Sequence, residues 1–254
     1  MTLPIKVWIE AEGRLLRLRL ARPKANIIDS AMIQSLRRTL DEHLGNPNLA
    51  GVLLDAEGPH FSFGASVEEH MPDRCLDMLK GLHALILQLV DSPVPVLVAV
   101  HGQCLGGGLE LALSGHLIFA APDATLGQPE IKIGVFAPAA SCLLPELVGP
   151  ARAIDLLLSG RSITGTEAAE MGMVSVAPDP EATAFAYFRE HLQPKSASTL
   201  RYAVKAARFD FVTRIRAKIE HVERFYLDDL MNSHDALEGL NAFLGKRSAQ
   251  WQHR

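Results

Sequence analysis

The amino-acid sequence predicts an α/β protein whose C-terminal part is entirely helical. Up to about residue 180, short apolar segments with the period of a strand alternate with segments of helical period. Beyond that point the strand pattern stops, and apolar residues recur every three or four positions. We therefore expect an α/β core over residues 1–180 and a helical region over residues 181–254.

The chain begins with two predicted strands, over residues 5–10 and 14–20, around the turn AEG. In the second strand leucine alternates with arginine, which predicts that only one face is buried. Asp29 and Ser30 then suit the N-cap of an amphipathic helix, which should extend to about residue 45.

The rest of the core should continue this alternation. We expect, in order, a buried strand that ends in a turn (50–58), a helix (74–90), the strand VLVAV between prolines, a helix that starts near Gly107, and the strand LIFAAP. The helices expected in the C-terminal region cover residues 181–192, 197–208, 211–230 and 234–245.

The composition indicates a globular, cytoplasmic protein. Of 254 residues 48% are hydrophobic and 21% charged. The formal net charge is −4 and no basic stripe is present, so we expect no nucleic-acid partner. The charged N-terminus does not resemble a signal peptide, and the longest apolar stretches are too short to span a membrane. Cys75, Cys104 and Cys142 lack CxxC spacing, so we expect buried, reduced thiols.

The segment GQCLGGGLELALSGH (102–116) is the first candidate for chemistry. Its glycines open a helix near Gly107, where the N–H groups of the first turn have no internal partner and can bind an anion. The alternative is close packing of the helix on a strand. Neither a P-loop nor a dinucleotide motif is present. Glu110 lies one turn further along this helix. Its carboxylate either reaches the space that these N–H groups face or points into solvent.

Glu130, in the segment ATLGQPEIKIG (124–134), is a second candidate acid. It follows a proline in a predicted loop, and solvated loop acids are common. Two carboxylates that meet beside an anion-binding pocket can handle a water molecule and a proton without a metal.

The segment HFSFGASVEEH (60–70) is the third candidate. The turn at Gly64 leaves the amide of Ala65 accessible to a ligand, unless the segment is an ordinary connection with Ser66 as an N-cap. We interpret His60 and His70 as surface histidines, because no further ligand stands at metal-binding spacing.

Six segments follow one another in a characteristic order: RPKANIID, FSFGAS, HGQCLGGGLELAL, ATLGQPEIKIGVFAP, LLLSGRSITGTEAAEMGMVS and FLGKRSAQW. In this order they resemble the crotonase (enoyl-CoA hydratase/isomerase) superfamily over nearly the whole chain. The resemblance implies a spiral of ββα units with C-terminal helices that build a homotrimer or a dimer of trimers. It also implies an acyl-CoA substrate, with CoA as part of the substrate and no separate cofactor or metal.

The resemblance assigns roles to four residues. The amides of Ala65 and Gly107 match the oxyanion hole that holds the thioester oxygen. Glu110 and Glu130 match the two catalytic glutamates, which hold one water between them as base and acid. The presence of both glutamates favours a hydratase or the reverse dehydratase over an isomerase or a thioester hydrolase.

Other positions depart from the family pattern. Ser66 replaces a common aspartate, and Glu68 stands where a lysine near the CoA phosphates is frequent. The remaining candidates for CoA binding are Lys24, Ala25, Lys246 and Arg247, of which Lys246 is a candidate for reaching the ligand of a neighbouring subunit.

The segment GVFAPAASCLLPELVG replaces the usual glycine-rich run after the second glutamate. Phe136 and Pro138 should form a bulky, rigid turn beside the acyl group, and the segment resembles that of dienoyl-CoA hydratases of anaerobic aromatic degradation. We therefore expect hydration of a conjugated cyclic dienoyl-CoA. The alternatives are an ordinary short-chain enoyl-CoA hydratase and a non-catalytic acyl-CoA-binding protein.

Overall fold

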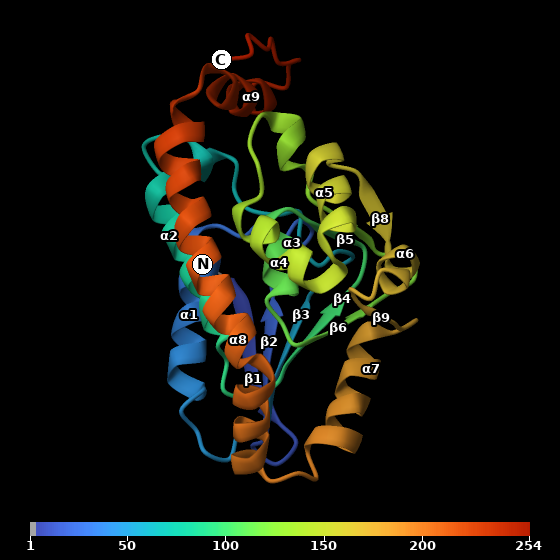
Figure 1. Cartoon of the computed structure of the whole chain (residues 1–254). Helices are drawn as coiled ribbons and strands as arrows, with labels where there is room; N and C mark the ends of the chain where they lie inside the picture. The colour runs from blue at the N-terminus through green and yellow to red at the C-terminus, as the bar shows by residue number, and fades with distance from the viewer. Residues whose placement is uncertain (1–3) are drawn as a thin grey trace.

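The structure is a computed structural model that describes residues 4–254, so residues 1–3 of the predicted core region lie outside it. Helices cover both faces of a central sheet (Figure 1). One face of the sheet packs against α1 (Ser30–His43) and α2 (Cys75–Val90). The other face packs against Ala184 of α7 (Pro180–Tyr187) and against Phe188, which directly follows this helix.

Within the described residues the central sheet has six strands in the order β1-β2-β3-β4-β6-β9. Only the pair β1–β2 is antiparallel. The strands of the central sheet are β1 (Ile5–Glu10), β2 (Leu15–Leu20), β3 (Gly51–Ala56), β4 (Val96–Val100), β6 (Leu117–Ala120) and β9 (Ser175–Val176). A second, three-stranded sheet contains β5 (Gln103–Leu105), β7 (Thr125–Gly127) and β8 (Ser162–Thr164).

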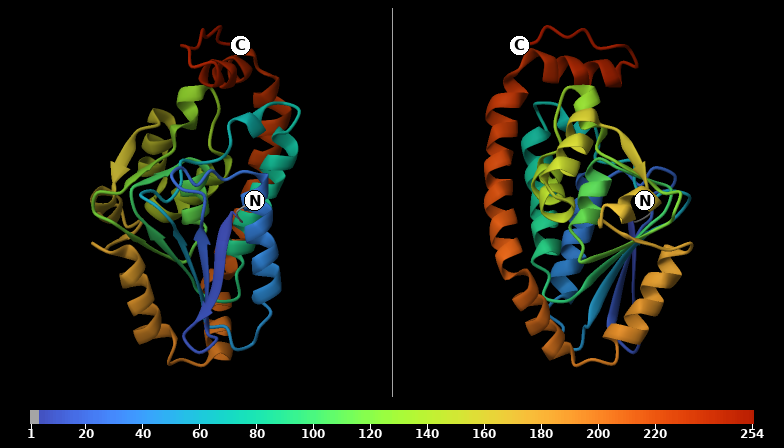
Figure 2. Two further views of the ribbon diagram at one scale, coloured as in Figure 1. Left: turned by 180° about the vertical axis from the view of Figure 1, so that it is seen from behind. Right: turned by 45° about the vertical axis from the view of Figure 1, so that its right-hand side comes forward.

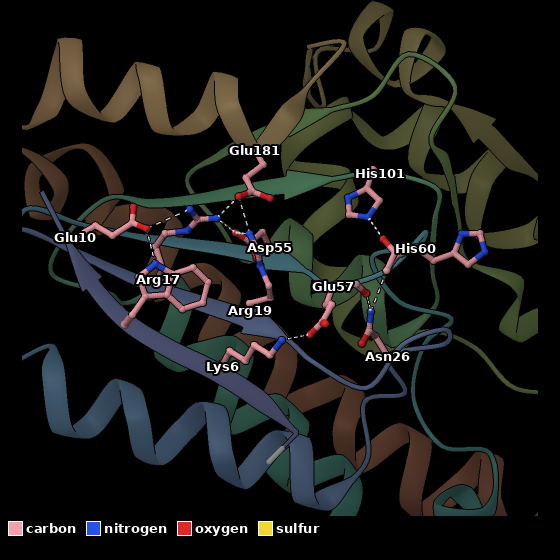
Figure 3. A network of polar contacts seen from close by, with 12 residues as sticks. Lys6, Glu10, Arg17, Arg19, Asn26, Asp55, Glu57, His60, His101 and Glu181 are labelled. Atoms are coloured by element: carbon pink, nitrogen blue, oxygen red, sulfur yellow. Dashed lines mark hydrogen bonds and ion pairs between the residues drawn. The ribbon is translucent and has the colours of Figure 1, made fainter. Parts of the chain in front are cut away.

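The prediction that β2 has one exposed face is wrong. Arg17 is only 6% exposed, because α7 covers the face that the arginines occupy. Arg17 and Arg19 both pair with the buried Asp55 of β3 and with Glu181 of α7 (Figure 3). Two charged side chains, Arg17 and Asp55, are therefore buried between the sheet and α7, which is possible because they pair with each other.

The helices predicted over the first part of the chain are confirmed. Asp29 caps α1, since its side chain accepts a hydrogen bond from the amide of Met32 at 2.9 Å. The α2 helix has the predicted extent, and α3 (Gly107–Leu113) begins at the predicted glycine. The helices α4 (Pro138–Val148), α5 (Pro150–Ser159) and α6 (Gly165–Glu170) follow, so Pro138 starts a helix rather than forming a turn.

The C-terminal region is helical as predicted, but the expected break near residue 210 is absent. A single helix, α8 (Ala197–Arg224), runs along the molecule and continues into the π-helical turn Phe225–Asp229 (Figure 2). No glycine or proline interrupts this stretch, so nothing ends the helix there. The α8 helix packs against α2 and α4, and α9 (His234–Leu244) follows it.

Two further expectations concern the whole molecule. In the part of the chain that the structure describes, no helix has the length and apolar character needed to cross a bilayer. Cys75, Cys104 and Cys142 are buried and form no disulfide among residues 4–254, as predicted. Burial raises the pKa of each thiol.

Candidate active site

Two loops, residues 21–29 after β2 and residues 57–67 after β3, meet the second sheet at the start of α3. The buried Asn26 ties these loops together, because its side-chain amide donates to the carbonyls of Glu57 and His60, both at 3.0 Å (Figure 3). Ser62 continues the link: its amide donates to the carbonyl of Gln103, and its carbonyl accepts from Leu105, both at 3.0 Å. These bonds hold the segment that carries Ala65 beside the end of β5.

The amides of Ala65 and Gly107 lie side by side. A Cβ atom placed on Gly107 would stand 3.1 Å from the amide nitrogen of Ala65, so any larger residue would fill the space between them. Neither amide donates to an acceptor within residues 4–254. Two free N–H groups at the beginning of α3 suit a developing negative charge.

Gly106 makes room for the second acid. Its φ of 52° and ψ of −130° favour glycine, and its amide donates to the carbonyl of Gly127 at 2.9 Å. A Cβ on Gly106 would lie 2.7 Å from Oε1 of Glu130. The carboxylate of Glu130 therefore lies directly against the turn that opens α3.

Glu110 faces the interior, not solvent. It is only 3% exposed, and its Oε1 accepts a hydrogen bond from the amide of Ala140 at 2.9 Å. Burial raises its pKa, while the Ala140 amide and the charge of His83 act in the opposite direction. The alternative of a solvated surface acid is wrong for this residue.

Glu130 is partly exposed, yet its carboxylate is surrounded by protein. Desolvation, followed by the negative charge of Glu110, raises its pKa to about 8. The buried Gln128 lies against it: with its amide nitrogen toward the carboxylate, Gln128 donates to both oxygens at 3.0 and 3.1 Å. The structure thus brings the two predicted acids within electrostatic reach of each other, with Glu130 at the turn before Gly107 and Glu110 in the first turn of α3.

An apolar cluster adjoins these acids. Phe136 is partly buried in it and packs on Phe225 and Tyr226, with ring centroids 5.6 and 5.2 Å apart. The buried members are Cys75, Met78, Leu79, Val135, Tyr226, Met231, Ala236 and Leu240. Pro138 is the first residue of α4, the helix whose amide at Ala140 binds Glu110.

The candidate CoA-binding residues are less defined. Lys24 and Lys246 are exposed, and the carbonyl of Ala25 accepts a hydrogen bond from Phe63 at 2.9 Å. Arg247 is engaged elsewhere, in a two-fold ion pair with Glu238 at 2.5 and 2.7 Å. The roles of Lys24, Ala25 and Lys246 stay predictions.

The two flanking histidines are half-buried rather than on the surface. Nδ1 of His60 accepts from the amide of Gln103 at 3.1 Å, and Nδ1 of His70 lies 2.7 Å from the carbonyl of Ser66. Both therefore brace the loop that carries Ala65. Among residues 4–254 no three metal-binding side chains cluster.

Sequence reasoning missed two buried polar side chains near the acids. His83 of α2 has its Nδ1 2.7 Å from Oε2 of Glu223, while its Nε2 has no partner within the described chain. The hydroxyl of Tyr226 is likewise without one in residues 4–254. A histidine inside the apolar run LHALILQLV was the only sequence signal for either.

The chain is similar to known proteins over nearly its whole length. Residues 10–254 match the enoyl-CoA hydratase/isomerase family. The chain is 65% identical over 252 residues to a cyclohexa-1,5-dienecarbonyl-CoA hydratase of Thauera aromatica, covering 99% of this chain and 98% of the relative. It is 34% identical to a "probable enoyl-CoA hydratase" of Bacillus subtilis, over 92% and 94% of the two chains. A crystal structure of an enoyl-CoA hydratase from Mycobacterium avium superposes with a TM-score of 0.87 at 25% identity, over 99% and 100%.

Proposed function

The chain belongs to the enoyl-CoA hydratase/isomerase family, and from this premise we propose that it adds water to cyclohexa-1,5-diene-1-carbonyl-CoA. The product is 6-hydroxycyclohex-1-ene-1-carbonyl-CoA, in anaerobic degradation of aromatic compounds. The observation that carries this proposal is the pair of carboxylates, Glu110 and Glu130, beside two free amides in a chain 65% identical to such a hydratase.

The amides of Ala65 and Gly107 hold the thioester oxygen. Addition of water at the β-carbon pushes an electron pair onto this oxygen, so its negative charge grows as the reaction proceeds. Donors already in place cost no rearrangement at that moment, and losing one oxyanion donor typically lowers the rate about 10²–10³-fold.

Glu110 acts as the base and Glu130 as the acid. Burial raises the pKa of both acids, and the charge of Glu110 raises that of Glu130 to about 8, so one of the pair keeps its proton at neutral pH. We assign the base to Glu110 because its carboxylate accepts a hydrogen bond from the amide of Ala140, which favours the ionised form of this member of the pair. Glu110 takes one proton from the water, and the hydroxide oxygen bonds to the β-carbon. Glu130 gives its proton to the far end of the conjugated system, which restores the carbonyl and leaves one ring double bond. The two steps together add one water, and transfer of a proton from Glu110 back to Glu130 through solvent restores the enzyme for the next turnover.

We propose that residues on the surface of the protein bind the CoA part of the substrate. Lys24 and Ala25 lie in the loop after β2, and Lys246 follows α9. We assign CoA to these residues, with Lys246 reaching the ligand of a neighbouring subunit. The helices of residues 181–254 would then hold together a homotrimer or a dimer of trimers built on the cores of residues 1–180.

An initial-rate spectrophotometric assay with the cyclic dienoyl-CoA and with crotonyl-CoA tests the substrate. We expect a higher kcat/KM for the cyclic diene. Faster turnover of crotonyl-CoA would instead identify an ordinary short-chain enoyl-CoA hydratase. Thioester binding without turnover of either compound would identify a non-catalytic binding protein, for which the pair of glutamates has no use.

A further inference from the structure

Tyr226 carries a buried hydroxyl that no part of the described chain satisfies. The residue is 0% exposed, and its oxygen has no hydrogen-bond partner among residues 4–254. An unpaired buried hydroxyl opposes folding, and such groups are rare in proteins. Tyr226 also lies in the π-helical turn Phe225–Asp229, and π-turns occur frequently at functional sites. Both features indicate a partner that the chain itself does not provide.

The position of Tyr226 indicates where this partner binds. Its ring packs edge-on against Phe136, with centroids 5.2 Å apart, and shares the apolar cluster with Cys75. Burial raises the pKa of the phenol, and the charges of Cys75, Glu130 and Glu110 raise it further. The hydroxyl therefore stands within electrostatic reach of both acids and remains a hydrogen-bond donor.

The proposed substrate offers few atoms that could accept this hydrogen bond. A cyclic dienoyl thioester has an apolar ring, and its carbonyl oxygen is held by the amides of Ala65 and Gly107. The remaining candidate is the oxygen atom of the water that is added. Before addition this oxygen belongs to a free water molecule, and after addition it is the ring hydroxyl of the product. An oxygen shared by two glutamates still has a lone pair for a donor.

We propose that the Tyr226 hydroxyl donates a hydrogen bond to this oxygen, first as water and then as the ring hydroxyl of the product. The assignment rests on the proposed function and adds a third contact to the two glutamates. Tyr226 transfers no proton: Glu110 accepts one from water, Glu130 delivers one to the ring, and the phenol is unchanged. It selects for the hydroxylated ring and orients the water for attack.

The test compares two thioesters that differ in the ring hydroxyl. We would measure, by calorimetry, binding of the hydroxylated product and of benzoyl-CoA to the Glu130→Gln variant and to the double variant that also carries Tyr226→Phe. The Glu130→Gln background slows turnover during the titration about 10²–10⁴-fold. Loss of one hydrogen bond should weaken binding of the product about tenfold and leave binding of benzoyl-CoA unchanged.

Two further measurements separate this role from a structural one. In the otherwise wild-type enzyme, Tyr226→Phe should lower kcat/KM for the cyclic diene, while the melting temperature stays equal or rises because an unpaired hydroxyl is removed. Tyr187→Phe on α7, a half-buried tyrosine packed on Phe119, is the matched control and should change neither quantity.

Equal weakening of both thioesters, no weakening of either, or a fall in melting temperature together with loss of both would overturn the role of Tyr226. Failure of the wild-type enzyme to hydrate the cyclic diene, with the selective loss for the hydroxylated thioester retained, would instead overturn the proposed function. In that case Tyr226 would remain a binding group for a ring hydroxyl.

Discussion

Oε1 of Glu130 lies 2.7 Å from the point where a Cβ atom on Gly106 would stand. The carboxylate of Glu130 therefore occupies the space that a side chain at Gly106 would need. This contact explains why a glycine precedes α3, although glycine weakens most regular structure.

Replacing Gly106 by alanine should displace Glu130. We expect kcat/KM to fall at least about 10²-fold, the lower end of what one acid contributes. Gly149→Ala is the matched control: this glycine has a φ of 80°, but no atom lies within 4 Å of its missing Cβ. It should cost about 1–3 kcal/mol of stability from backbone strain and leave kcat unchanged. Equal activity losses in the two variants would show that strain, not contact with Glu130, matters at Gly106.

Glu110→Gln and Glu130→Gln should each leave CoA-thioester binding nearly intact and lower kcat about 10²–10⁴-fold, as expected for the loss of a general base or acid. Initial rates combined with calorimetric binding constants test this. Glu220→Gln, an exposed position on α8, is the control and should behave as wild type. Wild-type turnover in either test variant would remove that glutamate from the mechanism.

The raised pKa of Glu130 should limit activity at alkaline pH. Above a pH of about 8 the residue loses the proton that it must deliver, so kcat/KM should fall tenfold per pH unit there. The residual rate of Glu130→Gln should lack this alkaline limb. A flat wild-type profile up to pH 9.5 (about 1.5 units above this pKa) would contradict the acid role.

The same shift links stability to pH. Between its ordinary pKa of 4.5 and about 8, Glu130 keeps its proton in the native state and loses it in the unfolded state. The native state thus binds more protons, and the free energy of unfolding should decrease as pH rises through this window. Urea unfolding at pH 5 and pH 8 (about the two ends of the window) should show wild type losing stability relative to Glu130→Gln.

Phe136→Ala should reduce the preference of the enzyme for the cyclic dienoyl-CoA over the straight-chain crotonyl-CoA. Phe136 packs on Phe225 and Tyr226 and offers a flat apolar wall, and such contacts supply about 1–3 kcal/mol of selectivity. The ratio of kcat/KM for the cyclic diene over crotonyl-CoA should fall accordingly. Phe243→Ala, on an exposed phenylalanine of α9, is the control. An unchanged ratio of the two kcat/KM values with a lower melting temperature would show that Phe136 only packs in the core and does not select the substrate.

The protein should form trimers or hexamers in solution. Tyr202 and Phe209 of α8 are 73% and 71% exposed, and Leu158 of α5 is 69% exposed. Large apolar side chains at this exposure favour association. Light scattering should give three or six times the mass of one chain, and a monomer at micromolar concentration would contradict the assembly.

Part of the fold followed from local pattern alone. The alternation of β1 and β2, the cap at Asp29 and the extent of α2 depend on neighbouring residues, so periodicity and capping predicted them. The prediction of one exposed face on β2 failed because α7, distant in sequence, covers it. The expected break in α8 is wrong because no glycine or proline ends the helix there, and its partly buried face continues through Arg208, Val212 and Ile215 at helical spacing.

The sequence by itself determined the family, the hydratase class and the order of the motifs, because these depend on residue types at short spacing. Tertiary structure alone decided that Glu110 is buried against Ala140, that Glu130 lies on Gly106, and that the unpaired hydroxyl of Tyr226 lies within electrostatic reach of both acids. The physical reason is that burial and electrostatic environment depend on elements that meet only when the chain is folded. The path of α8 past α2 and α4 brings Tyr226 to the site, and no local pattern encodes that path.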